Sequence, residues 1–303
     1  MRVVIALGGN ALLRRGEPLA AEIQRKNVFT AVSVAIAPIA RDHQVVITHG
    51  NGPQIGLLAL QSSAYRDVAP YPLDVLGAES EGMIGYMIEQ ALASELPGRS
   101  LATLLTQVEV DPEDPAFAAP SKPIGPVYSE QEAERLHSAT GWLFHPDTGG
   151  YRRVVPSPVP RRIREITAIK LLMHAGAIVV CAGGGGIPVV ALPDGRLRGV
   201  EAVIDKDHSA ALLAEELEAD VLLLLTDVPA VWTRWPRAEG VPIGSITAAA
   251  LRAFSFAPGS MAPKVAAACR FVEHTGRVAG IGALEDARSI LAGKAGTIIH
   301  AGP

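Results

Sequence analysis

The stretch that decides the fold lies at residues 199–211, which read GVEAVIDKDHSAA. A short apolar step at 202–204 runs directly into Asp205-Lys206-Asp207, and a segment rich in alanine and leucine follows at 210–217. This pattern predicts a turn that leads into a helix. Asp205 suits the N-cap, where its carboxylate can accept free backbone N–H groups, and Asp207 suits the first turn, where the helix dipole favours an anion. Two capping aspartates and a solvated lysine would explain the stretch; a functional interpretation depends on Lys206.

The choice between lysine and arginine makes Lys206 notable. The chain has 21 arginines and only 6 lysines, so arginine serves at most positions where any positive charge is sufficient. A lysine that remains can be one whose compact ammonium group cannot be replaced by a planar guanidinium. Lys26, Lys170 and Lys294 are typical of helix surfaces or chain ends. The other three, Lys122, Lys206 and Lys264, stand among glycine, proline or aspartate and are candidate functional residues.

Composition limits the class of protein. The chain has 303 residues, of which 49% are hydrophobic and 19% charged, enough for one large α/β domain or two small lobes. A formal net charge of −4 argues against general binding to nucleic acid or to a membrane surface, so a local cluster must hold any anion. Cys181 and Cys269 lack metal-binding spacing, and the sequence has neither a signal-peptide pattern nor an apolar run that could span a membrane. We therefore expect a soluble protein of the reducing cytoplasm.

Two strands in the first half are each predicted to end in a turn rich in glycine and asparagine. The strand at 2–7 ends at Gly8-Gly9-Asn10, and the strand at 44–48 ends at His49-Gly50-Asn51-Gly52-Pro53, with a helix at about 20–41 between them. Open α/β sheets bind ligands at the carboxyl ends of their strands, and glycine lets the backbone approach a ligand closely. Either turn alone is also typical of an ordinary tight turn. The pair makes a ligand site at this edge of the sheet a serious hypothesis.

The middle of the chain departs from the alternation of strands and helices. A helix is predicted at 73–96 from its 3.6-residue apolar period, as a core helix by default and as a subunit interface in the alternative interpretation. A strand at 101–108 precedes a region rich in proline and acidic residues, a polar helix at 129–137 and short aromatic stretches. We expect residues 111–160 to form an inserted lid lobe that carries Lys122. Three basic residues follow: Arg161, Arg162 and Arg164. They could contact phosphates, but we interpret them as the solvated start of a helix.

The second half predicts regular β-α-β units. Helices are expected at 163–175, from about 262 onward and at 284–291, and strands at 177–182, 221–225, 277–281 and 296–299. The four glycines at 183–186 fit neither the Rossmann fingerprint nor the P-loop, so any phosphate site here must use another design. The fold class expected is a single α/β domain: an open, mainly parallel sheet with helices on both faces, a three-layer sandwich with a small inserted lobe.

Eight short motifs in order along the chain are similar to those of the amino acid kinase family, and within it to the branch that phosphorylates carbamate. The motifs cover nearly the whole chain, and together they are far more specific than any one alone. Two departures concern the placement of substrates: His208 where an apolar residue is more usual, and Val127 in place of an aromatic residue. The motifs are residues 6–12 (ALGGNAL), 49–54 (HGNGPQ), 72–74 (PLD), 122–126 (KPIGP), 152–158 (RRVVPSP), 183–186 (GGGG), 203–207 (VIDKD) and 259–264 (GSMAPK).

The resemblance implies a reversible reaction of ATP with carbamate to give ADP and carbamoyl phosphate, with Mg²⁺ held by phosphate oxygens and water instead of by the protein. It places Lys206 and Lys264 on the transferred phosphoryl group and the nucleotide phosphates, Asp207 between these lysines, and Lys122 reaching in from the lid lobe. The N-terminal half would bind the acceptor and residues 161–303 the nucleotide. By the same resemblance Gly8, Gly9, Asn10, Gly50, Asn51 and Gly52 contact carbamate or the phosphoryl group, and Thr226, Asp227, Val231 and Met261 lie at the nucleotide.

The resemblance also implies a homodimer, for which the helix at 73–96 is the candidate interface. Two other functions stay open at this point. One is another acyl-phosphate kinase of the same family, acting on acetylglutamate, aspartate or a phosphonate. The other is a catalytically silent sensor that binds ligands on the same scaffold, although all three motif lysines are present.

Overall fold

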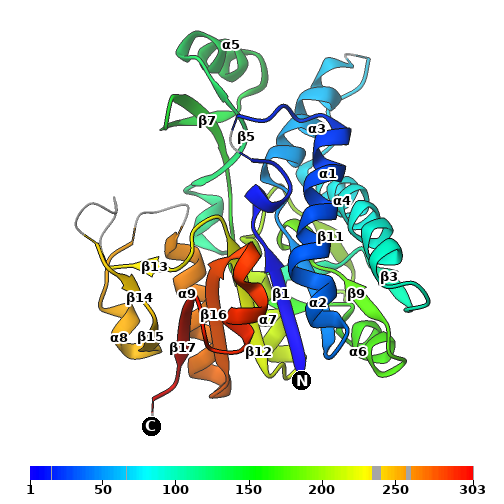
Figure 1. Cartoon of the computed structure of the whole chain (residues 1–303). Coiled ribbons are helices and arrows are strands. Elements are labelled where there is room, and N and C mark those ends of the chain that lie inside the picture. The colour runs from blue at the N-terminus through cyan, green and yellow to red at the C-terminus, as the bar shows by residue number, and fades with distance from the viewer. Residues whose placement is uncertain (15, 66, 234–239, 257–260, 303) are drawn as a thin grey trace.

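The main sheet places both predicted glycine turns at one edge. The computed structural model describes residues 1–14, 16–65, 67–233, 240–256 and 261–302. Within these ranges the main sheet has eight strands, parallel throughout except where β16 meets β17 (Figure 1). Their order is β15 (Ser245–Thr247), β17 (Thr297–His300), β16 (Val278–Ala283), β12 (Val221–Thr226), β1 (Arg2–Leu7), β2 (Gln44–His49), β9 (Ile178–Val180) and β3 (Leu101–Thr103). The predicted mainly parallel α/β fold is confirmed.

One strand runs against the expected direction. The β-α-β pattern of the second half predicted a parallel β17, but β17 pairs with β16 in the antiparallel direction. The chain reverses between Gly293 and Gly296, which have φ of +71° and +70° and so adopt a left-handed conformation that favours glycine. The last strand therefore enters the sheet from the opposite end.

Side chains of each central strand alternate between two hydrophobic cores. In β1, Val3, Ile5 and Leu7 face one core, and Val4 and Ala6 face the other. The first core lies under α1 (Ala21–Ala31), η2 (Val32–Ile36), α2 (Ala37–Ala40), α4 (Leu73–Glu95), η6 (Leu284–Asp286) and α10 (Ala287–Leu291). The second lies under α6 (Ile166–His174), α7 (Lys206–Glu216), α8 (Ala248–Arg252) and α9 (Met261–Thr275). The three layers follow from strands that are apolar on both faces.

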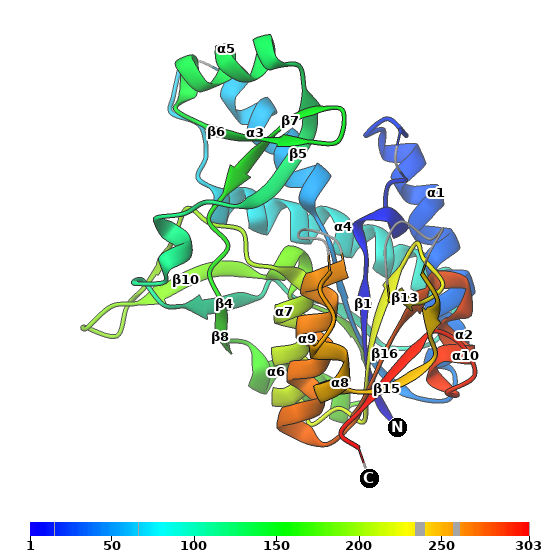
Figure 2. The same cartoon turned by 90° about the vertical axis from the view of Figure 1, so that its left-hand side faces the viewer.

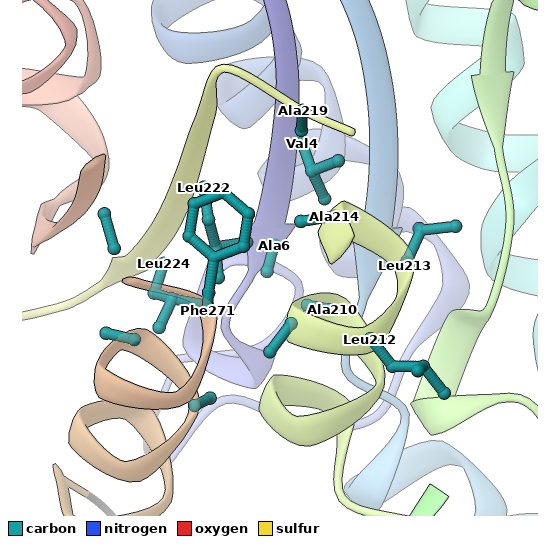
Figure 3. Packing of buried hydrophobic residues seen from close by; sticks show 14 of the residues in the cluster. Val4, Ala6, Ala210, Leu212, Leu213, Ala214, Ala219, Leu222, Leu224 and Phe271 are labelled. Carbon is teal, nitrogen blue, oxygen red and sulfur yellow. The ribbon is translucent and has the colours of Figure 1, made fainter. Parts of the chain in front are cut away.

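Small residues bring α7 close to the centre of the sheet. Ala210 and Ala214 of α7 are fully buried and lie in one cluster with Val4 and Ala6 of β1, beside Phe271 of α9 (Figure 3). Because α7 is followed by parallel strand β12, the helix starts at the carboxyl edge of the sheet. Close packing of α7 on β1 therefore places the first residues of α7 above the end of β1.

A second sheet corrects two sequence predictions. Its order is β11 (Leu197–Gly199), β10 (Ile187–Ala191), β4 (Gln107–Val110) and β8 (Pro160–Ile163), and it lies below the lobe in Figure 2. The strand predicted at 101–108 is two strands, β3 in the main sheet and β4 in the second sheet. Between them, the Thr106 N–H donates to a carboxylate oxygen of Glu81 at 2.9 Å and not to a neighbouring strand. The helix start predicted at 161–164 is strand β8 and the residue after it. Two of its exposed arginines pair with acidic residues: Arg161 with Asp111, and Arg164 with Glu109.

A small lobe stands above the carboxyl end of β1 (Figure 1). It consists of β5 (Lys122–Tyr128), β7 (Gly150–Val155) and β6 (Leu143–Asp147), in the order β5-β7-β6, with α5 (Glu130–Thr140). Ser129 and Glu132 form a capping box at the start of α5. The lobe rests on α3 (Gly52–Ala64), where a Cβ on Gly56 would lie 2.0 Å from Cα of Gly125, so both positions need glycine for this contact.

The remaining short elements are η1 (Gly9–Ala11), η3 (Pro115–Phe117), η4 (Gly183–Gly185), β13 (Val231–Trp232) and β14 (Pro242–Ile243). Among the described residues, no helix combines the length and the apolar character that crossing a membrane requires. The predicted long helix at 73–96 is α4, and its buried residues include Leu76, Ile84, Ile88 and Leu92, as expected of a core helix.

Candidate functional site

The two predicted glycine turns touch each other. Leu7 of β1 pairs with both His49 of β2 and Leu225 of β12, so the three strands end at the same level. A Cβ on Gly50 would lie 3.2 Å from the backbone nitrogen of Gly9. A Cβ on Gly8 would lie 3.0 Å from the Leu225 carbonyl oxygen. The close approach of these backbones explains the glycines and forms the floor of the candidate site.

The stretch at 205–207 begins α7 as predicted. Oδ1 of Asp205 accepts hydrogen bonds from the backbone N–H groups of Asp207 at 2.9 Å and His208 at 3.3 Å. Asp205 is therefore the N-cap, and that prediction is confirmed. The other oxygen of Asp205 remains free for a different partner. Asp207 lies in the first turn, where the helix dipole stabilises its charge.

Three lysines from different parts of the chain meet at these two aspartates. The Asp207 carboxylate lies between two ammonium groups, with Oδ1 2.6 Å from Nζ of Lys206 and Oδ2 2.9 Å from Nζ of Lys264. Nζ of Lys122 on β5 donates to Oδ2 of Asp205 at 2.8 Å. The three lysines singled out by their setting in the sequence thus form one cluster.

Burial and charge act in opposite directions on this cluster. Burial alone would raise the pKa of Asp207, but the ammonium groups of Lys206 and Lys264 outweigh it and hold the pKa below its usual range. For Lys264, burial opposes the charge, yet the attraction of Asp207 raises the pKa. For Lys206, burial dominates and lowers the pKa despite the same carboxylate. Both Lys206 and Asp207 are charged, because each oxygen of Asp207 faces an ammonium group.

Asp205 behaves in the same way. Burial would raise its pKa, but the nearby charges of Lys122, His208 and Lys206 lower it well below the usual range. His208, which departs from the family pattern, therefore faces an anion at the start of α7.

The four-glycine run joins the turn after β2 to the turn before α7. A Cβ on Gly183 would lie 2.3 Å from Nε2 of His49, and a Cβ on Gly184 would lie 2.1 Å from Nδ2 of Asn51. A Cβ on Gly185 would lie 2.4 Å from the carbonyl oxygen of Ile204. Side chains at these positions would push the two turns apart, so the run is required for packing at the site.

Several buried polar residues lie near the glycine run, and sequence reasoning assigned no role to three of them: His49, Ser80 and Glu81. Burial lowers the pKa of His49 to about 4, so its ring is neutral, and Nδ1 lies 3.1 Å from the carbonyl oxygen of Gly50. Nδ2 of Asn51 donates to Oγ of Ser80 at 2.8 Å, and burial raises the pKa of Glu81 well above its usual range. Ser80 and Glu81 stand at core positions of α4, and this break in its apolar period was the available signal.

The residues predicted at the nucleotide are more dispersed. Thr226 ends β12, and its Oγ1 donates to Oδ1 of Asp227 at 3.1 Å. The charge of Asp227 contributes to the raised pKa of Lys264. Met261 begins α9, one turn from Lys264. Val231, in contrast, has no exposed surface, and its N–H donates to Oγ1 of Thr297 at 2.8 Å.

Three predicted positions need separate mention. Gly52 is the first residue of α3 and has open space on its Cβ side. The backbone of Asn10 lies in η1, but its side chain is outside the part that the structure describes. Gly259 and Ser260 of the motif at 259–264 also lie outside the described residues.

The carboxylates of the cluster are engaged by lysines. Among the described residues, no group of three or more histidine, cysteine, aspartate or glutamate side chains could hold a metal ion. A cavity of about 560 Å³ lies elsewhere, lined by Met1, Arg2, Gln44 and Asp220 among others. These residues stand at the amino ends of the strands, at the edge of the sheet opposite the lysine cluster.

The fold agrees with comparison to known proteins. Residues 1–281 match the model of the amino acid kinase family, and the chain belongs to that family. Relatives named carbamate kinase include one from Rhizobium meliloti, 58% identical over 99% of this chain and 93% of that protein. Another, from Escherichia coli K12, is 51% identical over 98% of both chains.

Solved structures agree with these relatives. Carbamate kinase from Giardia lamblia bound to citric acid superposes with a TM-score of 0.92 at 42% identity, covering 99% of this chain and 98% of that one. The same enzyme bound to AMP-PNP gives a TM-score of 0.89 at 42% identity with the same coverage.

Proposed function

We propose that this chain is a carbamate kinase, which transfers a phosphoryl group between ATP and carbamate to give ADP and carbamoyl phosphate. The observation that carries this proposal is the cluster of Lys122, Lys206 and Lys264 around Asp205 and Asp207 at the carboxyl edge of the sheet. Relatives at 51% and 58% identity over nearly the full length bear this name. The family relationship supplies the reaction, and the cluster supplies a physical means to catalyse it.

The reaction poses an electrostatic problem that such a cluster can solve. The transferred phosphoryl group, its neighbouring phosphates and the attacking carbamate oxygen are all anionic, so the nucleophile needs no general base. Catalysis then consists of in-line positioning and neutralisation of charge. Lys206 is buried and the side chain of Lys264 is only 12% exposed, and in such surroundings an ammonium group stabilises developing charge more strongly than it would in water. We assign these two lysines to the transferred group and the nucleotide phosphates.

Each remaining residue has a role in this scheme. Asp207 holds the two lysines apart at fixed positions, and Lys122 comes from the lobe to the transferred group. Backbone N–H groups of the turns at 8–10 and 50–52 bind carbamate or the phosphoryl group. The nucleotide lies over the second half near Thr226, Asp227, Val231 and Met261, of which Val231 has no exposed surface. In this scheme 1–303 is a single domain, 111–160 its lid lobe and 161–303 its nucleotide-binding half.

Mg²⁺ accompanies the nucleotide in this proposal. Both oxygens of Asp207 already face ammonium groups, and Asp205 is shared between Lys122 and the start of α7, so neither is suited to direct coordination. Mg²⁺ retains water readily and binds phosphate oxygens. When bound there it would add positive charge beside the nucleotide phosphates.

We further propose a cytoplasmic homodimer. Both cysteines of the described chain, Cys181 and Cys269, are free and buried, which suits a reducing compartment. On α4, Tyr86 is 51% exposed and Val75 39% exposed, and a Cβ on Gly82 would contact nothing within 4 Å. This outer surface is the candidate interface. Light scattering should give twice the chain mass; a monomer would exclude the dimer.

A coupled assay tests the function directly. Purified chain, ADP, Mg²⁺ and carbamoyl phosphate should produce ATP, detected through hexokinase and glucose-6-phosphate dehydrogenase. Acetylglutamate and aspartate should not be phosphorylated by ATP under the same conditions. Activity on either acid with none on carbamoyl phosphate would indicate another acyl-phosphate kinase of the family. Nucleotide binding without turnover on any of these compounds would indicate a silent sensor.

A further inference from the structure

The segment just before α7 contacts the lobe with every second residue. Oε1 of Glu201 lies 3.6 Å from a guanidinium nitrogen of Arg153, and Oδ2 of Asp205 lies 2.8 Å from Nζ of Lys122. Between them, Val203 is buried in an apolar cluster that also contains lobe residues. The alternation is that of an extended backbone, although these residues belong to no strand.

Backbone and apolar contacts hold this segment against the lobe. The Val203 N–H donates to the carbonyl oxygen of Pro156, just after β7, at 2.9 Å. Ile124 of β5 and Val155 of β7 share the cluster with Val203, and are 0% and 3% exposed. The apolar contact in the middle is thus flanked by two ion pairs, one toward Lys122 and one toward Arg153.

Arg153 is an unusual residue for a small lobe. Its residue exposure is 7%, and its guanidinium carbon lies 3.8 Å from the centre of the Trp142 ring. Burial lowers the pKa of Arg153 to about 10, against the opposing effect of Glu201, so the group stays charged at neutral pH. A buried guanidinium requires partners, and stacking on Trp142 together with the carboxylate of Glu201 supplies them.

The sheet register connects Arg153 to Lys122. In the antiparallel pair of β5 and β7, Lys122 lies opposite Val155, and Ile124 lies opposite Arg153. Directly opposed residues share a face, and so do residues two apart, so Lys122 and Arg153 are diagonal neighbours on the inner face of the lobe. A shift of Arg153 would carry the strand of Lys122 with it.

Glu201 is in turn fixed to the body of the protein. Its Oε2 accepts the backbone N–H of Leu73 at the start of α4, at 2.8 Å. Nearby, Asp74 lies so close to Gly199 that a Cβ there would be 1.6 Å from a carboxylate oxygen. Arg153 therefore contacts a carboxylate that is itself anchored to α4, and not only a mobile surface group.

We propose that Arg153 is a positioning residue for Lys122: by docking on Glu201 and Trp142, it sets the register in which the lobe presents the Lys122 ammonium to the cluster at α7. This inference rests on the proposed function. In this proposal Arg153 contacts neither substrate. It acts through Lys122, which the proposed function places at the transferred phosphoryl group.

A double-mutant cycle in the coupled assay tests this dependence. Arg153→Ala should lower kcat/KM about tenfold when Lys122 is present, and less than twofold in the Lys122→Ala background, since residues that act through one another are not additive. The same tenfold loss in both backgrounds, or no loss in either, would overturn the proposal. Arg161→Ala, which removes an exposed arginine from β8, is the matched control and should leave kcat/KM unchanged.

A second variant and hydrogen exchange of the lobe test the same role of Arg153. If Arg153→Ala does not fold, Glu201→Gln removes only the charge and should give the same non-additive pattern with Lys122→Ala. Hydrogen exchange of the amides at 122–128 should be faster in Arg153→Ala than in the wild type, while that of α9 should not change. Unchanged exchange at 122–128 would refute the positioning role even if the wild-type chain had no carbamate kinase activity, an outcome that would by itself refute the proposed function.

Discussion

Replacing Asp207 by asparagine tests the centre of the site. The carboxylate contacts two ammonium groups, at 2.6 and 2.9 Å, and asparagine can offer an oxygen to only one of them. Its NH₂ group would face the other ammonium, donor against donor. Breaking a buried ion pair costs about 3–5 kcal/mol, and the charged hydrogen bond from Lys264 accounts for about 1.5–3 kcal/mol of such a loss.

The expected effect on catalysis follows from the displaced lysine. Losing one oriented charge donor at a reaction centre lowers kcat by about 10²–10³. We therefore expect Asp207→Asn to lower kcat by that factor in the coupled assay, and to lower the free energy of unfolding in urea by about 3–5 kcal/mol. Asp111→Asn, which removes a carboxylate paired with an arginine outside the site, is the control and should change neither quantity greatly.

Two results would refute this reasoning. A kcat for Asp207→Asn within about threefold of the wild type would mean that the lysines do not need the carboxylate between them. Full recovery of kcat at high Mg²⁺ concentration would mean that Asp207 holds the metal and does not organise the lysines. Measurements over a range of Mg²⁺ concentrations at saturating ADP and carbamoyl phosphate separate the two cases.

The other predictions concern single residues of the same site. Lys206→Ala and Lys264→Ala should each lower kcat by about 10²–10³ in the coupled assay, and near-wild-type turnover in both would remove the site assignment. Lys206→Arg should also be poorly active because its site is buried; an active variant would show that ammonium geometry did not select the lysine. Gly184→Ala should destabilise the protein by at least about 1–3 kcal/mol in urea, because φ is +67° and the new methyl would lie 2.1 Å from a side-chain amide, whereas Gly195→Ala, with φ of +83° and open space, should cost less. Burial lowers the pKa of His49 from 6.5 to about 4, so on acidification the unfolded chain binds a proton at this residue before the folded chain does. Proton binding by the unfolded chain favours unfolding, so the neutral ring contributes its full stability to the fold above pH 6.5, and this contribution is lost as the pH falls toward 4. Its size is about 3 kcal/mol, and the difference in unfolding free energy between wild type and His49→Gln at pH 7.5 and pH 4.5 measures it; no change in that difference would contradict the shift.

Strong local patterns made much of the fold predictable. The strands β1, β2 and β12 have apolar centres, and glycine follows both β1 and β2. The cap at Asp205 has a short-range signature. Errors arose where tertiary contacts decide the structure. The division of 101–108 between two sheets depends on Glu81, a residue on a distant helix, and no local pattern reports that contact.

The sequence indicated which lysines form the cluster but not how they come together. An uneven choice between lysine and arginine singled out Lys122, Lys206 and Lys264, but only the fold brings β5, α7 and α9 together. The sequence did not reveal the roles of His49 and Glu81, which are buried. A polar residue among apolar ones can be buried with a hydrogen-bond partner or exposed to solvent, and the sequence alone does not say which. The docking of Arg153 on Glu201 depends on sheet register, which the sequence did not define.

The central position of β1 has a consequence for how the two substrates could be changed independently. Its five residues from Val3 to Leu7 have no exposed surface, and the strand forms the common border between the half that begins with β2 and the half that begins with β12. The two sides meet through close contacts at the glycine turns, such as that of Gly50 with Gly9, so a loop exchanged on one side must keep those glycines. Under the proposed function, a chimera that takes its turn after β2 from a distant relative should bind a different acceptor and the original nucleotide, provided that the border strand and these contacts are kept.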